Sequence, residues 1–202
     1  VCYTGTGSAT TVTHNLGVAP ELLITKKRSN TSNWQVYCAY VNSGTTPQNY
    51  RMELNLTLAQ NADSTMWNNT APTTTQFTLG TSTDVNASGE TYAAYLFASC
   101  SGVSKVTNFT GNGTTQTINC GFTAGARFVL IKATSTTGNW LTFDTARGMT
   151  TSTDPWLALN STAAESATTG ACTTTSVGFT VDESKLTGVN TNGVSYIALA
   201  IA

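Results

Sequence analysis

The chain has 202 residues, of which only 9% are charged, and its net charge is −1. Average soluble proteins carry about 25% charged residues, and a near-neutral chain lacks the basic surface typical of proteins that bind nucleic acid or anionic membranes. No apolar run reaches the roughly 18 residues of a transmembrane helix. Hydrophobic residues make up 40% of the chain and fall in short runs, which argues against disorder.

The first half of the chain predicts a series of short strands separated by turns. Apolar residues alternate with threonine and other polar residues, and β-branched side chains suit a pleated surface. Residues 51–58, for example, place Met52, Leu54, Leu56 and Leu58 on one face. The predicted strands cover residues 9–14, 21–27, 34–37, 51–58, 76–79 and 91–99, with turns at 17–20 and 86–89.

The second half repeats this plan, and no segment shows sustained helical periodicity. Its predicted strands cover residues 115–120, 127–133, 140–144, 156–160, 176–181 and 195–202. Many short strands with Gly and Asn turns are typical of a β-sandwich, here of jelly-roll kind. The predicted fold class is all-β, with two tandem antiparallel β-sandwich domains.

The two halves also match residue by residue. Tyr3-Thr4-Gly5-Thr6-Gly7 corresponds to Phe109-Thr110-Gly111-Asn112-Gly113 at an offset of 106. The offset then slips: Leu54-Asn55-Leu56 is paired with Leu157-Ala158-Leu159, and Tyr92 with Tyr196. A repeat of this length can bury its own core. We therefore expect an internal duplication with domains at residues 1–102 and 103–202, joined by a short linker at about residues 100–105.

The chain shows no catalytic motif and no set of metal ligands. His14 is the only histidine, and Cys120 stands at its place in the second copy. Hydrolase, nucleotide-binding and calcium-binding motifs are absent. The carboxylates fall mostly at predicted strand ends or turns and are expected to be solvated: Glu21, Glu53, Asp63, Asp84, Glu90, Asp154, Glu165, Asp182 and Glu183. We expect no enzyme activity, no catalytic residue and no cofactor.

Five cysteines occur at spacings that suggest no zinc site: Cys2, Cys38, Cys100, Cys120 and Cys172. We expect free, partly buried thiols. A disulfide between Cys2 and Cys100 remains an alternative, because these residues flank the predicted strands of the first half.

Four tryptophans are candidates for stacking on a ligand such as a sugar. Trp34 and Trp140 recur at one position of the repeat, which favours a structural role, although ligand contact remains an alternative. Tyr92 and Tyr196 are predicted to be structural for the same reason. Trp67 has no clear counterpart and Trp156 lies just before a predicted strand, so these two are the candidates for ligand or partner contact.

Several motifs resemble a duplicated domain of unknown function from bacteriophage proteins. They include the Tyr-Thr-Gly-x-Gly start, the segments 14–21, 67–73 and 86–92, and the strand 94–98. Domains of this kind occur in tail-fibre and other virion proteins, many of them from marine phages or cyanophages. The second copy departs from the pattern at Cys120-Gly121, and it lacks the Trp-Asn-Asn-Thr-Ala-Pro segment. A site built on that segment would therefore occur once per chain.

The resemblance implies a non-enzymatic virion protein assembled in the bacterial host cytoplasm and placed on the virion surface. It would act as a tail-fibre or receptor-binding module, or as a capsid decoration protein. Its partners would be other capsid or tail proteins, with a host surface glycan as a further ligand, and neither nucleic acid nor membrane. A homo-oligomer, guessed to be a trimer, follows from the same resemblance. The alternatives are a carbohydrate-binding module and a cell-surface adhesin domain.

Overall fold

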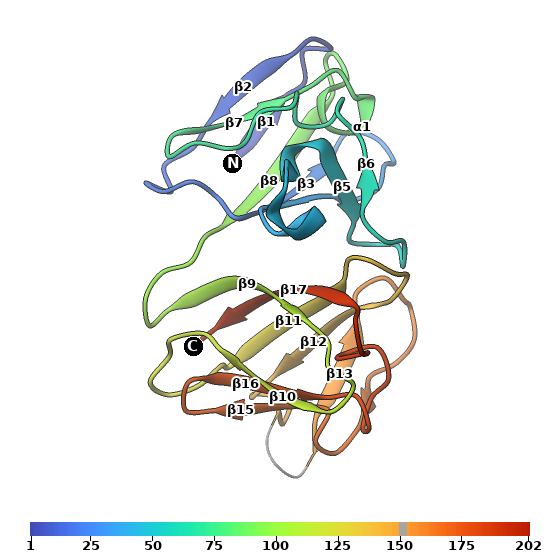
Figure 1. Cartoon of the computed structure of the whole chain (residues 1–202). Helices are drawn as coiled ribbons and strands as arrows, with labels where there is room; N and C mark the ends of the chain where they lie inside the picture. Colours follow the sequence, from blue (N-terminus) through green and yellow to red (C-terminus); the bar gives the residue numbers. More distant parts are fainter. Residues whose placement is uncertain (150–152) are drawn as a thin grey trace. The chain divides into compact units, whose positions relative to one another are not determined.

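The structure, a computed structural model, describes residues 1–149 and 153–202. Chain contacts divide it into two compact units (Figure 1). The first unit contains Val1–Asn55 and Gln60–Ala98, and the second contains Leu56–Ala59 and Ser99–Ala202. Each strand pairing in the described ranges is antiparallel, which confirms the all-β class. No helix within those ranges is long and apolar enough to cross a membrane.

The first unit has a six-stranded sheet and a two-stranded sheet. The large sheet has the order β1 (Cys2–Thr4), β8 (Thr91–Phe97), β3 (Leu22–Lys27), β4 (Gln35–Cys38), β5 (Tyr50–Glu53) and β6 (Asn61–Ala62). The small sheet pairs β2 (Thr10–Thr13) with β7 (Gln76–Leu79). The only helices described in this unit are short: α1 (Thr83–Asn86) and the 3-10 turns η1 (Val41–Gly44) and η2 (Pro47–Asn49). Apolar side chains from both sheets share one core, including Leu23, Tyr37, Phe77 and Leu79.

The second unit is built in the same way. Its large sheet has the order β9 (Ser104–Thr110), β17 (Ser195–Ile201), β11 (Phe128–Ala133), β12 (Trp140–Asp144), β13 (Pro155–Ala158) and β14 (Ser166–Ala167). Its small sheet has the order β10 (Thr115–Asn119), β16 (Gly178–Asp182) and β15 (Cys172–Thr175). Counted from the first strand of each unit, the two large sheets therefore have the same strand order, and β15 is an addition to the second unit.

Side-chain contacts fix which residues of the two units correspond. The Oδ1 atom of Asn55 accepts a hydrogen bond from the Trp34 backbone N–H at 2.9 Å, and Asn160 accepts one from Trp140 at 2.7 Å. Asn55 is thus the counterpart of Asn160. The sequence-based pairing of residues 54–56 with 157–159 is therefore wrong by two residues. That pairing aligns leucines, whereas the structurally equivalent residues are the asparagines that accept from the tryptophan N–H groups.

A buried asparagine ties the Gly-x-Gly loop of each unit to the segment before the last strand. In the first unit, the Asn86 amide donates to the carbonyls of Ser8 and Gly80 at 2.7 Å each and accepts from the Thr6 N–H at 2.8 Å. In the second unit, Asn190 bonds to the backbone N–H of Asn112 and to the carbonyl of Thr114. We call Asn86 and Asn190 the asparagine clasps.

Paired aromatic rings reinforce each clasp. Tyr92 stacks on Tyr3 with centroids 4.9 Å apart, and its hydroxyl accepts from the Ala87 N–H. Tyr196 stacks on Phe109 at 5.0 Å and accepts in the same way from Thr191. Tyr92 and Tyr196 are 0% and 1% exposed.

Candidate functional site

Trp67, predicted to contact a ligand or partner, lies in the core of the first unit. Its side chain is 2% exposed, its indole N–H donates to the Tyr50 carbonyl at 3.0 Å, and its ring meets Tyr37 edge-on. Asn68 and Asn69 follow it with φ of 52° and 51°, a left-handed turn that asparagine tolerates and that redirects the chain after the tryptophan. The expectation that Trp67 is an exposed contact residue is wrong.

The other tryptophans differ in exposure. Trp140 is 1% exposed, whereas its counterpart Trp34 is only half-buried. Trp156, the second predicted contact residue, is partly buried against the core of the second unit, and its indole N–H donates to Thr168 Oγ1 at 3.3 Å. Trp34 therefore offers more open aromatic surface than Trp67, the reverse of the sequence-based expectation.

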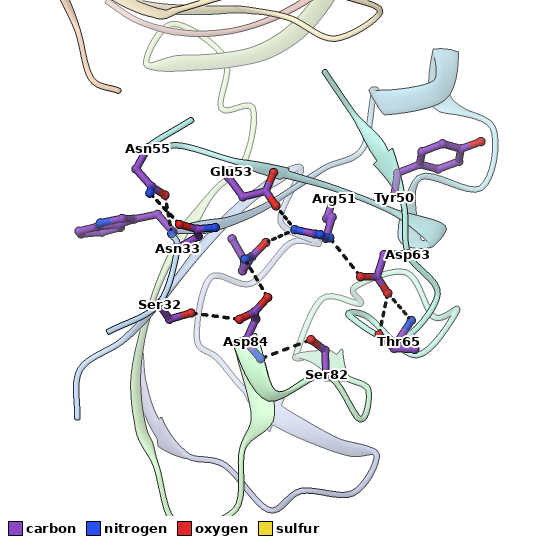
Figure 2. Close-up of polar contacts among 12 residues, drawn as sticks. Ser32, Asn33, Tyr50, Arg51, Glu53, Asn55, Asp63, Thr65, Ser82 and Asp84 are labelled. Carbon is purple, nitrogen blue, oxygen red and sulfur yellow. Dashed lines mark hydrogen bonds and ion pairs between the residues drawn. The ribbon is translucent and has the colours of Figure 1, made fainter. Parts of the chain in front are cut away.

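A polar network centred on Arg51 lies on strands β4 and β5 of the large sheet in the first unit (Figure 2). The guanidinium pairs with Glu53, contacts Asp63 through Nε at 3.1 Å, and donates to Gln35 Oε1 at 3.4 Å. Glu53 is only 3% exposed and Gln35 is 0% exposed. We call these residues, together with Asp84, the Arg51 network.

Asp84 extends the network to α1. Its carboxylate accepts from Gln35 Nε2 and from Ser32 Oγ, both at 3.3 Å, while its own backbone N–H is capped by Ser82 (Figure 2). The expectation that the carboxylates are solvated is therefore wrong for Glu53, which is buried beside Arg51. It is also wrong for Asp154, which is 0% exposed and accepts from the Cys172 N–H. Both corrections depend on cross-strand or cross-sheet neighbours that local sequence does not reveal.

The second unit fills the same place with apolar side chains. Arg51 pairs across the sheet with Asn61, and Trp156 pairs in the same position with Ser166, so Trp156 is the counterpart of Arg51. The register also makes Leu141 and Ala158 the counterparts of Gln35 and Glu53. The polar network thus belongs to the first unit alone of the two described units. The same strand arrangement forms with polar side chains at these positions in the first unit and with apolar side chains in the second.

The network's geometry points to positioning of strands. Two carboxylates and an amide surround the one guanidinium, and charge-assisted bonds of this kind are directional. Among the residues that the structure describes, no group of three or more His, Cys, Asp or Glu side chains is placed to hold a metal ion.

Replacing Arg51 with an uncharged residue should destabilise the first unit. We expect Arg51→Met to lower its free energy of unfolding by about 3 kcal/mol, because the buried Glu53 carboxylate loses its ionic partner. Denaturant unfolding measures this change. The double variant Arg51→Met with Glu53→Ala, which takes its alanine from the second unit, should recover part of the loss. Equal losses in the single and double variants would contradict the ionic role.

His14 has a structural environment. Its ring is 7% exposed, lies 6.5 Å from the Phe77 ring, accepts from the Leu16 N–H at Nδ1, and places Nε2 3.2 Å from the Thr73 carbonyl. These contacts hold the loop after β2 against the segment that leads into β7.

All five cysteines are free thiols in the structure, so the alternative of a Cys2–Cys100 disulfide is not realised there. Cys2 and Cys100 are exposed, while Cys38, Cys120 and Cys172 are buried. Burial raises the pKa of Cys38 to about 12 and that of Cys120 to about 11.

The difference in exposure among the five cysteines predicts which thiols react with a reagent in the folded chain. At pH 8, a thiol reagent should label Cys2 and Cys100 rapidly, because a buried thiol with a raised pKa supplies almost no thiolate. Mass spectrometry of tryptic peptides would assign the labels, and labelling in urea provides the fully reactive control. Fast native labelling of Cys38 would contradict the packing described here.

The first unit also carries an open groove with apolar and aromatic walls. It encloses about 440 Å³ and is lined by Val1, His14, Asn15, Leu16 and the β8 residues 94–97. Tyr95 is 50% exposed at this groove, and its ring stacks on Trp34 with centroids 6.3 Å apart. Lys26 places its amine 6.0 Å from the Trp34 ring centroid. The recurrence of Trp34 as Trp140 favours a structural role, and no sequence signal marks Tyr95 as exposed. This aromatic pair could therefore not be predicted from the sequence.

Comparisons with known proteins give one match. The family described as "Domain of unknown function (DUF7483)" matches residues 1–202. No curated protein and no solved structure matches the chain. Because the match spans every residue, the chain belongs to the DUF7483 family.

Proposed function

We propose that the chain is a non-enzymatic structural and binding module on the exterior of a bacteriophage virion. It would consist of two jelly-roll-like β-sandwich domains, residues 1–102 and 103–202, that arose by tandem duplication. The shared strand order and the recurring asparagine clasps support the duplication. The resemblance of its motifs to those of tail-fibre and other virion proteins supports the location.

One observation carries the binding part of the proposal: the scaffold recurs, while the surfaces differ. The first unit has an open groove beside Tyr95, lined in part by loop residues 14–16, and its Trp34 is half-buried where the counterpart Trp140 is 1% exposed. Loops on a rigid β scaffold are common sites of recognition. The proposed partners are capsid or tail proteins of the same particle, in a symmetric, trimeric arrangement.

Purified particles test the location directly. We expect mass spectrometry to find the chain in the particles and electron cryomicroscopy to place it on their exterior in symmetric copies. Three copies around a tail axis would support a tail-fibre role, and regular copies over the shell would support decoration. Absence of the chain from purified particles, or its recovery with a cellular enzyme complex, would overturn the proposal.

Glycan binding is a second candidate function, favoured by the stacked Trp34–Tyr95 pair on the first unit. The exposed Tyr95 ring and the half-buried Trp34 ring, with the charged Lys26 amine nearby, suit the apolar faces and hydroxyl groups of sugars. A glycan array with the purified chain tests this function, with Trp34→Ala and Tyr95→Ala expected to abolish binding. Val177→Ala, an exposed apolar change in the second unit, is the control. A free carbohydrate-binding module or an adhesin domain would share this behaviour, whereas absence from virions distinguishes them from the virion protein.

A further inference from the structure

The loop between β3 and β4 and the loop between β11 and β12 are closed by the same contacts. In the first unit, the Lys26 amine donates to the Ser32 carbonyl at 3.0 Å, and in the second unit the Lys132 amine donates to the Gly138 carbonyl at 2.9 Å. The serine three residues after each lysine accepts from a backbone N–H of the last strand, at 2.9 Å in the first unit and 3.0 Å in the second. The two loops therefore place their lysine and their backbone in equivalent positions.

In the second unit, this loop binds a carbonyl oxygen. Thr57, which belongs to the second unit, directs its carbonyl oxygen at two donors: the Gly138 N–H at 2.8 Å and the Lys132 amine at 3.1 Å. A lysine amine carries three N–H groups and accepts no hydrogen bond. The lysine amine and the loop N–H thus form a site for an oxygen atom that accepts hydrogen bonds.

The first unit has the same two donors on partly exposed residues. Among the residues that the structure describes, none accepts from the Ser32 N–H, and the Lys26 amine donates to the carbonyls of Lys27 and Ser32 at 2.9 and 3.0 Å. Residues 26–32 line an open hollow of about 880 Å³. An acceptor oxygen from a ligand can therefore reach the Ser32 N–H and the third N–H of the Lys26 amine.

The first unit also adds positive charge at this loop. Lys27 and Arg28 follow the lysine of the site, whereas the neutral Ala133 and Thr134 stand at their places in the second unit. Of the four Lys and Arg residues in the first unit, only Arg51 lies elsewhere, and both added cations line the hollow. A neutral carbonyl occupies the site in the second unit, while the added cations favour an anionic acceptor in the first.

Two carboxylates of the first unit lie beside the loop. Asp84 accepts from the Ser32 hydroxyl at 3.3 Å, and Glu90 accepts from the Ser29 hydroxyl. Both carboxylates thus bond to serine side chains of the loop, and neither bond uses the Ser32 N–H or the Lys26 amine. Three cations against two carboxylates leave the loop with a positive charge.

Aromatic side chains lie next to the two donors. The Lys26 amine is 6.0 Å from the centroid of the Trp34 ring, which stacks on the half-exposed Tyr95 ring at 6.3 Å. Aromatic rings bind the apolar faces of ligands, and a few polar groups beside them fix the ligand's orientation. A sugar held by these rings can therefore place an acidic group at the Lys26 amine.

We propose that the Lys26 amine and the Ser32 N–H bind the carboxylate of a uronic acid residue in an acidic saccharide. One carboxylate oxygen would take the place that the Thr57 carbonyl oxygen holds in the second unit, and the sugar ring would lie against Trp34 and Tyr95. Charge-assisted hydrogen bonds are stronger than those between neutral groups, so the carboxylate supplies selectivity over neutral sugars. The proposal rests on glycan binding by the Trp34–Tyr95 pair and names the class of glycan.

Matched oligosaccharides test this selectivity. Oligomers of galacturonate, glucuronate and mannuronate, each beside its carboxyl-reduced neutral form, would be titrated into the isotope-labelled chain. At least one acidic oligomer should bind about tenfold more tightly than its reduced form, a ratio expected for the loss of one charge-assisted bond, and should shift the Ser32 amide resonance. Equal affinity for the acidic and reduced forms would overturn the carboxylate site and leave glycan binding intact. Absence of binding to every oligomer would overturn both.

Substitutions of single cations locate the site. Lys26→Met keeps the aliphatic stem and removes the amine, so it should weaken binding of the acidic oligomer by about tenfold and leave binding of the reduced form unchanged. Because Lys26 also closes its loop, the double variant Lys27→Met with Arg28→Met, which retains that contact, should weaken acidic binding as well. The matched control Lys185→Met removes an exposed cation of the second unit and should leave the affinity unchanged. If all these variants bind the acidic oligomer alike, the proposal fails.

An acidic peptide separates a saccharide ligand from a polypeptide ligand. Acetylated tetraglutamate offers carboxylates without sugar rings, so at equal concentration it should not displace the acidic oligomer or shift the Ser32 amide. If the peptide shifts Ser32 and binds more tightly than every oligomer, the site takes a polypeptide carboxylate, and the saccharide assignment is wrong.

Discussion

Asn86→Ala is expected to destabilise the first unit by roughly 3 to 5 kcal/mol. The substitution removes four hydrogen bonds of a fully buried amide. The Thr6 N–H and the carbonyls of Ser8 and Gly80 then lose their side-chain partner. A buried group left unsatisfied costs about 1 to 3 kcal/mol. Urea unfolding, with exchange of individual amides to separate the units, measures the loss.

Two variants serve as comparisons for this prediction. Asn190→Ala removes the corresponding clasp and should destabilise the second unit by a similar amount. Asn30→Ala changes an exposed asparagine and should stay within about 0.5 kcal/mol of the unmodified chain. A loss below 1 kcal/mol for both clasp variants would show that water or a rearranged loop replaces the amide.

Gly111→Ala should be at least as damaging, because the clasped loop leaves no room for a side chain. A Cβ at Gly111 would lie 2.1 Å from the Thr191 carbonyl oxygen, and one at Gly5 would lie 2.2 Å from that of Ala87. Both obstacles are backbone atoms, so the loop itself must move. We expect a loss of about 3 kcal/mol or more, with failure to fold as the upper extreme.

Gly193→Ala is the matched control for this steric effect. Gly193 has φ of +76° but open space around its Cβ position, so the substitution imposes only backbone strain of about 1 to 2 kcal/mol. Thermal unfolding of the two variants should therefore place Gly111→Ala well below Gly193→Ala. Equal melting temperatures would mean that the close approach of residues 111 and 191 does not stabilise the fold.

Strands with buried faces could be predicted from the sequence because their residues alternate or are largely apolar. The ranges predicted at 76–79 and 140–144 coincide with β7 and β12. Edge strands gave no such pattern: β6 and β14 have two exposed residues each. The strand predicted over 51–58 ends at Glu53, and β9 begins inside the segment interpreted as a linker.

The burial of polar and aromatic side chains was harder to predict, because it depends on contacts between segments that are distant in sequence. Glu53 is buried only because β5 places it opposite Gln35 and beside Arg51. Asn86 occupies a segment that predicted a simple turn, whereas its side chain reaches Ser8, far away in sequence. Trp67 has no counterpart in the second unit, and the lack of a counterpart does not indicate whether a side chain is exposed.

The pairing of first and last strands has a consequence for how such units can be combined. β1 lies beside β8 in one unit, and β9 lies beside β17 in the other, each pair running antiparallel. In the second unit, Ser104 is directly opposite Ile201, so the chain enters and leaves at the same end of the sheet. A short connection could join these two points at little cost in loop-closure entropy. Such a unit is suited to circular permutation, and to insertion as a cassette into a surface loop of a host protein.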